Sequence, residues 1–289
     1  MSAHLPRLSL IGFGEAGSTF ARAGQWSGAA TGWDIHEERR ALMPECGVAP
    51  AADARAALEG AAIVLSLVTA DSALPAASDY ARWLSPGAIW CDMNSVSPET
   101  KRQAAAMVEE AGGRYVDVAV MAPVDPQALS VPLLIAGAAA QDATGMLNAL
   151  GFANTRVVGD EVGRASAIKM IRSVMVKGLE ALTAELVLAA DSAGVLDEVL
   201  ASLDASEKQV SWTERADYNL DRMIVHGLRR AAEMQESAKT LAGLNIAPMM
   251  TDNTVAWQQA IGELAILPPK GLRAKIDAIK ASPGFKRPN

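Results

Sequence analysis

Short apolar runs alternate with alanine-rich amphipathic stretches over the first half of the chain. One run, Ala62–Val68, is almost entirely apolar, which is typical of a strand covered on both faces. The pattern predicts strands over Leu8–Gly12, Ala30–Asp34, Ala62–Val68, Ala88–Asp92, Tyr115–Val120, Leu133–Gly137 and Thr155–Val158. The stretches between them predict helices over Ala16–Gln25, Asp53–Leu58, Pro98–Ala111 and Ala140–Leu150. Strands alternating with helices through short connections predict an α/β domain with a doubly wound, mostly parallel sheet.

The pattern changes after Gly159. Glu161–Ser192 contains no proline, and its apolar residues recur at helical spacing for about eight turns. Gly194 then supplies a helix stop signal. Further helices are predicted over Asp197–Leu203, Glu207–Met223, Leu228–Ala242, Asp252–Glu263 and Leu272–Lys280. We therefore predict two domains: residues 1–160 with the sheet, and residues 161–289, all helical and opened by one long interdomain helix.

A glycine-rich turn joins the first predicted strand to the first predicted helix. Its glycines, Gly12, Gly14 and Gly17, have the G-x-G-x-x-G spacing, and an acidic residue, Asp34, ends the next strand. In a Rossmann domain these glycines permit the tight turn, the approach of a pyrophosphate to the backbone and close helix packing. The predicted cofactor-binding residues are Gly12, Phe13, Gly14, Glu15, Ala16, Gly17, Asp34, Val68, Thr69 and Asn94. The alternative is an ordinary turn without a ligand.

The acidic residue also bears on which dinucleotide binds. A carboxylate at Asp34 would accept hydrogen bonds from the adenosine ribose, and its charge would repel a 2′-phosphate. NAD is therefore favoured over NADP as the cofactor. Arg39 and Arg40 weaken this preference, because either could turn toward a phosphate.

Composition and charge exclude several other classes of protein. Half of the 289 residues are apolar and the net charge is −7, so we expect a buried core and no nucleic-acid partner. The apolar runs are shorter than the roughly 20 residues that span a bilayer. No signal peptide is recognised, so we expect a cytoplasmic protein that does not associate with membranes. Two cysteines and three scattered histidines lack the spacing of a disulfide framework or a metal site.

Four segments in order resemble the β-hydroxyacid dehydrogenase family, which includes 3-hydroxyisobutyrate and 6-phosphogluconate dehydrogenases. They are Gly12–Gly17, Asp92–Pro98, Asp117–Pro123 and Val162–Lys169, and together they extend over most of the chain. The resemblance implies a hydride transfer between a nicotinamide and a small 3-hydroxy acid or sugar acid, with possible decarboxylation or rearrangement of the product. It also implies a homodimer or homotetramer.

The resemblance assigns Lys169 as the general base that removes the hydroxyl proton. Because a free lysine is protonated at neutral pH, we expect burial and the nearby cations Arg172 and Lys177 to lower its pKa. The alternative is a solvated helix lysine. The predicted substrate-binding residues are Asn94, Ser95, Met121, Ala122, Pro123, Ser173, His226 and Arg229.

Some positions depart from the family pattern. Met121–Pro123 stands where the family has Ser-Gly-Gly, and Ser173 stands where it has asparagine. Arg229 and Arg230 occur where Lys-Asp is usual. These departures are similar to a branch whose helical domain is described only as phosphogluconate-dehydrogenase-like. Two other functions remain open: an NADPH-dependent imine reductase, and a catalytically silent NAD-binding regulatory protein.

Overall fold

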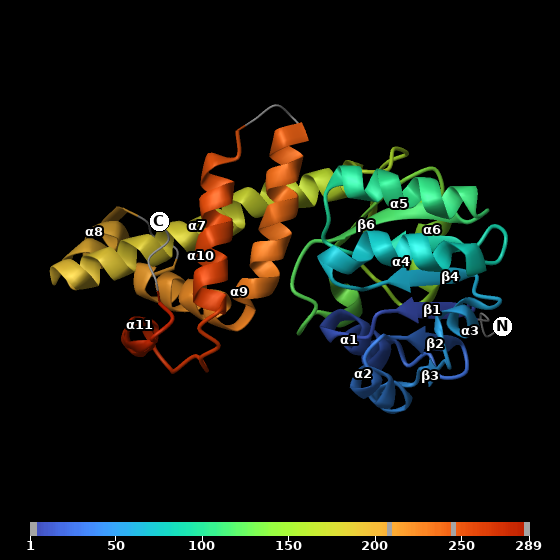
Figure 1. Ribbon diagram of the computed structural model, residues 1–289, viewed down its shortest axis with the longest axis horizontal. Helices are drawn as coiled ribbons and strands as arrows, with labels where there is room; N and C mark the ends of the chain where they lie inside the picture. Colours follow the sequence, from blue (N-terminus) through green and yellow to red (C-terminus); the bar gives the residue numbers. More distant parts are fainter. Residues whose placement is uncertain (1–4, 207–209, 244–246, 286–289) are drawn as a thin grey trace. The chain divides into compact units, whose positions relative to one another are not determined.

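The computed structural model describes residues 5–206, 210–243 and 247–285 (Figure 1). The chain divides into two compact units, residues 1–170 and 171–289. The division falls inside helix α7 (Arg164–Ala193), whereas the sequence pattern placed it between residues 160 and 161. The first turns of α7 belong to the sheet-containing unit.

Within the described residues, an eight-stranded sheet forms the centre of the first unit. Its strand order is β3-β2-β1-β4-β5-β6-β7-β8, and neighbouring strands are parallel except for the antiparallel pair β6 and β7. The strands are β1 (Leu8–Ile11), β2 (Ala30–Trp33), β3 (Ala49–Pro50), β4 (Ile63–Ser66), β5 (Ile89–Asp92), β6 (Arg114–Val120), β7 (Leu133–Ala136) and β8 (Thr155–Gly159). The predicted doubly wound, mostly parallel sheet is confirmed.

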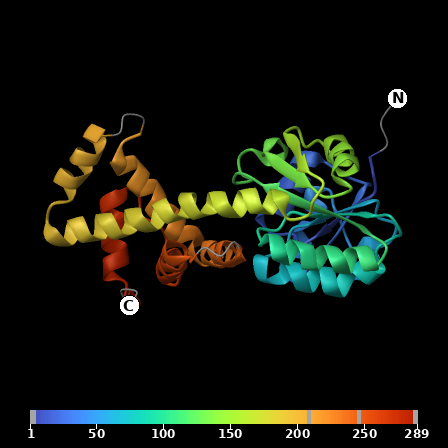
Figure 2. The ribbon, with the colours of Figure 1, turned by 90° about the horizontal axis from the view of Figure 1, so that it is seen from above.

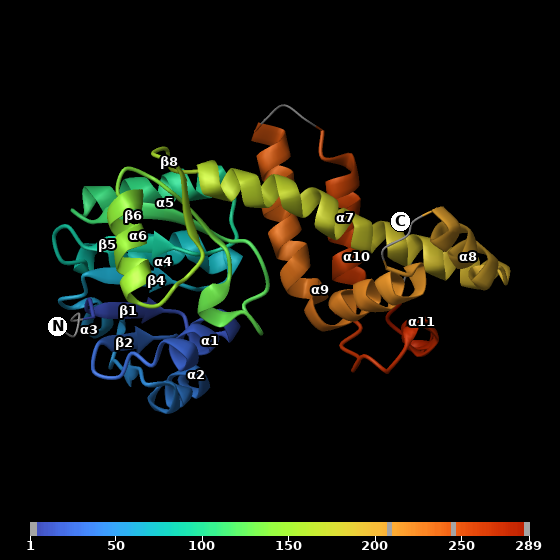
Figure 3. The ribbon, with the colours of Figure 1, turned by 180° about the vertical axis from the view of Figure 1, so that it is seen from behind.

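Helices cover both faces of this sheet, and alternate strand residues point to opposite faces. Ile63 and Leu65 of β4 pack in one cluster, with α1 (Glu15–Gly24) and α6 (Ala140–Ala149), whereas Val64 packs in the other. The second cluster includes α3 (Ala54–Leu58), α4 (Ala73–Tyr80) and α5 (Pro98–Glu110). Figure 1 shows α4 and α5 in front of the sheet, and Figure 3, which views the opposite side, shows α6.

The sequence pattern missed three short elements. Strand β3 has only two residues, at the sheet edge, and α2 (Glu37–Leu42) buries none of its residues, so neither shows an apolar period. Helix α4 contains Pro75 near its start, and a proline in the sequence usually indicates that a helix is interrupted. Proline is tolerated in the first turn because the N–H groups there have no partner inside the helix.

The elements of the second unit that the structure describes are all helices. Four helices follow α7: α8 (Leu196–Ser206), α9 (Trp212–Gly243), α10 (Met249–Gly262) and α11 (Leu272–Ala281). Figure 2 shows α7 as one unbroken helix. The predicted helical second region is confirmed. No described helix is both long and apolar enough to cross a membrane.

Helix α9 corrects one prediction. The sequence predicted two helices separated near Gly227, but one helix continues through this residue. A Cβ atom added at Gly227 would lie 2.4 Å from the carbonyl oxygen of Gln258 and 2.7 Å from Cα of Gly262. The glycine is therefore where α10 packs directly on the α9 backbone, and it does not end the helix. The part of the first predicted helix at residues 207–209 lies outside the described residues.

The second unit also buries charged side chains. Arg230 of α9 forms an ion pair with Glu180 of α7, and both side chains are less than 10% exposed. Gln258 of α10 donates a hydrogen bond of 2.9 Å to the other oxygen of Glu180. Lys177 lies 2.5 Å from Glu233. These contacts connect α7, α9 and α10. Removing one partner of a buried pair would leave an uncompensated charge, which is costly.

Candidate functional site

The glycine turn has the close contacts that the motif requires. Gly12 has φ +93°, and a Cβ atom there would lie 2.6 Å from the carbonyl oxygen of Leu67. At Gly17 a Cβ atom would lie 2.7 Å from the carbonyl oxygen of Gly12, so α1 packs against the turn. At Gly14 the nearest atom to such a Cβ is Nη1 of Arg39, 3.9 Å away. Gly12 and Gly17 are needed by the fold itself, whereas Gly14 leaves the backbone open on the side where a phosphate would approach.

Asp34, at the end of β2, is tied to the glycine turn. Its Oδ2 accepts a hydrogen bond of 2.7 Å from the backbone N–H of Phe13, and its Oδ1 accepts one of 2.9 Å from the N–H of His36. Arg40 lies over the ring of Trp33 and donates to the backbone carbonyl of Asp34. The carboxylate is therefore oriented beside the turn and keeps lone pairs for a ligand's hydroxyls.

Two other predicted cofactor residues follow β4. The N–H nitrogen of Val68 lies 2.9 Å from the position of a Cβ atom on Gly12, so this segment borders the glycine turn. Thr69 donates from Oγ1 to Asp71, at 2.5 Å. Glu15 and Ala16 lie in the first turn of α1. These residues lie at the carboxyl ends of parallel strands, where open α/β sheets bind their ligands.

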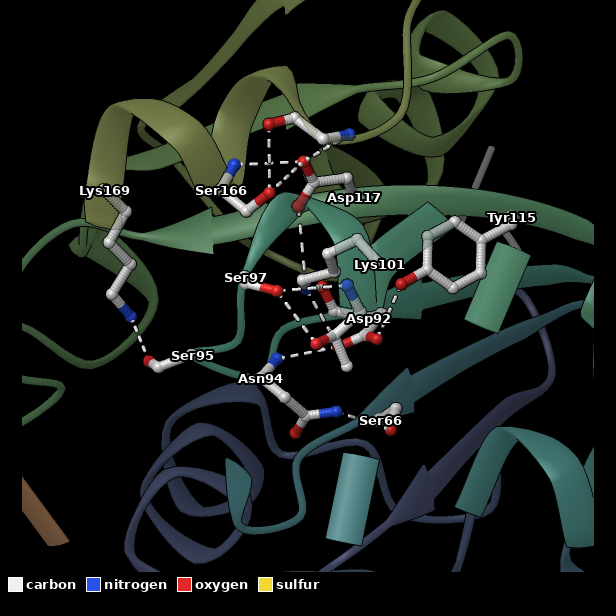
Figure 4. Close-up of polar contacts among 12 residues, drawn as sticks. Ser66, Asp92, Asn94, Ser95, Ser97, Lys101, Tyr115, Asp117, Ser166 and Lys169 are labelled. Carbon is white, nitrogen blue, oxygen red and sulfur yellow. Dashed lines mark hydrogen bonds and ion pairs between the residues drawn. The ribbon is translucent and has the colours of Figure 1, made fainter. Parts of the chain in front are cut away.

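The loop after β5 presents an oriented amide. The N–H of Asn94 donates to Asp92 Oδ1 at 2.9 Å, and its side-chain Nδ2 donates to Ser66 Oγ at 3.0 Å (Figure 4). Within the described part of the chain, the buried Oδ1 of Asn94 has no hydrogen-bond partner. A buried acceptor without a partner is costly. A ligand that donates an N–H or O–H would satisfy it, and together with the open side of Gly14 this fits a dinucleotide.

The structure brings together two predicted site residues that are 74 positions apart in sequence. Nζ of Lys169, in the second turn of α7, donates a hydrogen bond to Oγ of Ser95 in the loop after β5 (Figure 4). Both side chains are half-buried. An amine and a hydroxyl at this edge of the sheet can together hold and deprotonate an alcohol.

A buried cluster of charged side chains lies under this pair, and the sequence analysis missed it. Lys101 of α5 is fully buried, and its Nζ lies 2.9 Å from Asp92 Oδ1 and 3.5 Å from Asp117 Oδ1. Tyr115 donates to Asp92 Oδ2 at 2.6 Å. Burial and the Asp92 charge raise the pKa of Tyr115 well above its usual value, so the phenol stays protonated. The sequence did contain a sign that this lysine is buried, because Lys101 lies on the same face of α5 as the buried residues Ala104, Ala105 and Val108.

Asp117 holds the start of α7. Its Oδ2 accepts hydrogen bonds from the N–H groups of Gly163, at 3.1 Å, and Ser166, at 3.0 Å, and from the hydroxyl of Ser166 at 3.0 Å. A carboxylate at a helix N-terminus is stabilised by the unpaired N–H groups and by the helix dipole. This contact fixes the first turns of α7 to the sheet unit.

The remaining segment of the first unit follows β6. The N–H of Met121 donates to the carbonyl of Pro132, and the Met121 side chain packs against a small cluster that includes Ala165 of α7. Ala122 is half-buried and Pro123 is exposed. Met121 therefore lies beside the start of α7, and the contact of this segment with a substrate remains a prediction.

Three predicted substrate residues belong to the second unit. Ser173 is buried on α7, and His226 is half-buried on α9. Arg229 is half-exposed, with its Nε 3.8 Å from Glu233. Lys177, expected beside Lys169, also pairs with Glu233. The roles of Ser173, His226 and Arg229 remain predictions.

Comparisons with known proteins agree with the fold. Residues 7–159 match the NAD binding domain of 6-phosphogluconate dehydrogenase, and residues 190–261 match a domain of unknown function (DUF1932). A conserved hypothetical protein from Sinorhizobium meliloti 1021 is 34% identical, with a TM-score of 0.74 over 96% of each chain. A conserved protein of unknown function, described as structurally similar to 3-hydroxyacid dehydrogenases, is 30% identical, with a TM-score of 0.71 over 93% of this chain and 99% of the other.

More distant structures share the fold alone. A 3-hydroxyisobutyrate dehydrogenase from Mycobacterium tuberculosis is 16% identical, with a TM-score of 0.74 over 96% of this chain and all of the other. An imine reductase from Myxococcus stipitatus is 22% identical, with a TM-score of 0.60 over 95% and 99%. The family predicted from the motifs is thus confirmed: the chain belongs to the family defined by the NAD-binding domain of 6-phosphogluconate dehydrogenase, with a helical second domain of the DUF1932 type.

Proposed function

We propose that the protein is an NAD-dependent dehydrogenase that oxidises a small 3-hydroxy acid or sugar acid, with Lys169 as the general base. The observation that supports this most is the hydrogen bond between Lys169 and Ser95 at the carboxyl edge of a sheet whose domain belongs to an NAD-binding family. The second domain, of residues 161–289, would contribute substrate contacts through Ser173, His226 and Arg229 and would assemble the protein into a dimer or tetramer.

Different residues of the first unit bind different parts of the dinucleotide and the substrate. The backbone at Gly14 and the first N–H groups of α1 hold the pyrophosphate, and Asp34 accepts from the adenosine ribose. The unpartnered Oδ1 of Asn94 would accept a hydrogen bond from the nicotinamide end of the dinucleotide. When bound, the nicotinamide accepts the hydride. Ser95 and the Met121–Pro123 segment hold the acid group of the substrate.

Lys169 moves the proton. Its neutral amine takes the hydroxyl proton as the carbonyl forms, and in the reverse direction the ammonium returns it. Ser95 holds Nζ by its hydrogen bond, which limits the directions in which the flexible lysine side chain can point. Oxidation of a 3-hydroxy acid places a keto group β to the carboxylate, and this keto group can accept the electron pair when CO2 leaves or the product rearranges.

The test is the formation of reduced nicotinamide when the purified protein is mixed with NAD and a panel of 3-hydroxy and sugar acids. We expect a rise in absorbance with at least one acid. If the protein binds NADH but turns over no acid in the panel, while cyclic imines are reduced with NADPH, the imine reductase function replaces the proposal. Binding without turnover of either class points to a silent regulatory protein.

Cofactor preference gives a separate prediction. Replacing Asp34 with asparagine removes the negative charge and keeps an oxygen for the Phe13 N–H. Because hydrogen bonds to a charged group contribute about 1.5–3 kcal/mol, NADH affinity should fall about 10- to 100-fold, and NADPH affinity should rise. Fluorescence titrations with both dinucleotides measure the ratio.

The matched control is Glu37→Gln, which removes an exposed carboxylate of α2 and leaves Asp34 in place. This variant should keep NADH affinity and bind NADPH no better than the wild type. If Asp34→Asn keeps the wild-type ratio of NADH to NADPH affinity, Asp34 does not set the preference.

A further inference from the structure

Two backbone segments have to be held in place for Lys169 and Ser95 to meet. Ser95 lies in the loop after β5, and Lys169 lies three residues after Ser166 at the start of α7. Each segment is held by a different buried carboxylate. Asp92 Oδ1 accepts from the N–H of Asn94, and Asp117 Oδ2 accepts from the N–H and the hydroxyl of Ser166.

These two carboxylates face each other across neighbouring strands. Asp92 of β5 and Asp117 of β6 are register partners in a parallel pair, and their side chains are 1% and 0% exposed. Two buried negative charges in this position repel each other, and repulsion in a water-free site is strong. Without a neighbouring cation, this repulsion would push the two side chains apart.

Lys101 is the cation between them. Its Nζ donates to the backbone carbonyl of Asp92 at 2.5 Å and to its Oδ1 at 2.9 Å, and it lies 3.5 Å from Asp117 Oδ1 (Figure 4). Within the described part of the chain, Asp117 Oδ1 accepts no hydrogen bond, so Lys101 is its close compensating charge.

We infer that Lys101 is a positioning residue for the Lys169–Ser95 pair: it holds the carboxylates of Asp92 and Asp117 side by side, and through them the loop and the helix that carry the pair. The inference rests on the proposed function, because it assigns a purpose to the geometry of that site. A buried apolar residue at position 101 would avoid the desolvation cost of an ammonium group. The charge is therefore best explained by the two groups that it joins.

The main test is Lys101→Met, with Lys275→Met as its matched control. Lys275 is also almost fully buried and pairs with two carboxylates, Asp217 and Asp221, but it lies in the other compact unit. For Lys101→Met we expect kcat to fall about 10- to 100-fold, because a displacement of about 1 Å at a reacting group costs rate on that scale. The NADH dissociation constant should change by less than about twofold. Lys275→Met should keep wild-type kcat.

A second measurement does not depend on turnover. Hydrogen–deuterium exchange should become about 10-fold faster in the segments 93–97 and 163–170 of Lys101→Met, because their N–H groups lose partners held in place by the lysine. The same segments should exchange at the wild-type rate in Lys275→Met. If no acid is turned over, the proposed function fails, and this measurement still decides whether Lys101 holds the two segments.

Two further variants keep the test decisive if Lys101→Met does not fold. Lys101→Met combined with Asp117→Asn removes one of the two opposed charges and leaves an oxygen for Ser166, so exchange and kcat should return part of the way to wild type. Ser166→Ala removes the hydroxyl contact to Asp117 and should lower kcat several-fold with unchanged NADH binding. Wild-type kcat and wild-type exchange in Lys101→Met, or in Ser166→Ala if Lys101→Met does not fold, would overturn the inference.

Discussion

Replacing Lys169 with methionine should lower kcat for hydroxy-acid oxidation by about 10²- to 10⁴-fold, the usual contribution of a positioned general base. Methionine keeps much of the length of lysine but has no amine to take the hydroxyl proton. NADH affinity should stay within about twofold of wild type, because the residues assigned to the dinucleotide lie in α1 and in the loops that follow β1, β2, β4 and β5. Steady-state kinetics on the acid found in the panel, with NADH titrations, measure both quantities.

The control for this variant is Lys239→Met. Lys239 is 63% exposed on α9 and pairs with Glu236 three residues earlier, so its loss removes a surface charge only. It should leave kcat unchanged. A Lys169→Met protein that keeps more than about a tenth of wild-type kcat would show that Lys169 is not the base. Imine reduction that survives the substitution would favour the reductase.

The stability of the helical unit should depend strongly on Arg230. Arg230→Met leaves the carboxylate of Glu180 buried without its ion-pair partner, and breaking a buried pair in this way costs about 3–5 kcal/mol. Urea unfolding at neutral pH, followed by circular dichroism, should show a free energy of unfolding lower by that amount. Arg229→Met is the matched control: the neighbouring residue is half-exposed, and its loss should cost less than about 1 kcal/mol.

The loss of stability in Arg230→Met should also depend on pH. Burial raises the pKa of Glu180, and the charge of Arg230 opposes this rise, so the pKa should rise further in Arg230→Met. Between its ordinary and its raised pKa, the native carboxyl binds a proton that the unfolded chain has already released. The native state therefore gains stability as the pH falls through the raised pKa. The stability difference from wild type should be largest at neutral pH and smaller toward about pH 5.

A double variant separates charge from packing. Glu180→Gln combined with Arg230→Met removes both charges and leaves an amide oxygen that can accept from Gln258. It should recover most of the lost stability, because an unpaired amide costs less to bury than an unpaired carboxylate. Equal stabilities of Arg230→Met and Arg229→Met would contradict the role of the buried ion pair.

The cofactor half of the candidate site was predictable because its signals are local. Gly12, Gly14 and Gly17 lie within six residues, and the strand before them and the helix after them show their own periodicity. Lys169 and Ser95 were named separately, through the family resemblance. That their side chains meet depends on a contact between residues 74 positions apart, which no local pattern encodes.

The sequence by itself determined the alternation of strand and helix, the glycine turn, the family and the helical nature of the second half, because each depends on patterns repeated over neighbouring residues. Only the tertiary structure decided what Lys101 and Gly227 do. Asp92 and Asp117 need the cation of Lys101 because they come into register across β5 and β6, and Gly227 stays inside a helix because α10 packs against its backbone. Both facts depend on segments that are distant along the chain and become neighbours only when it folds.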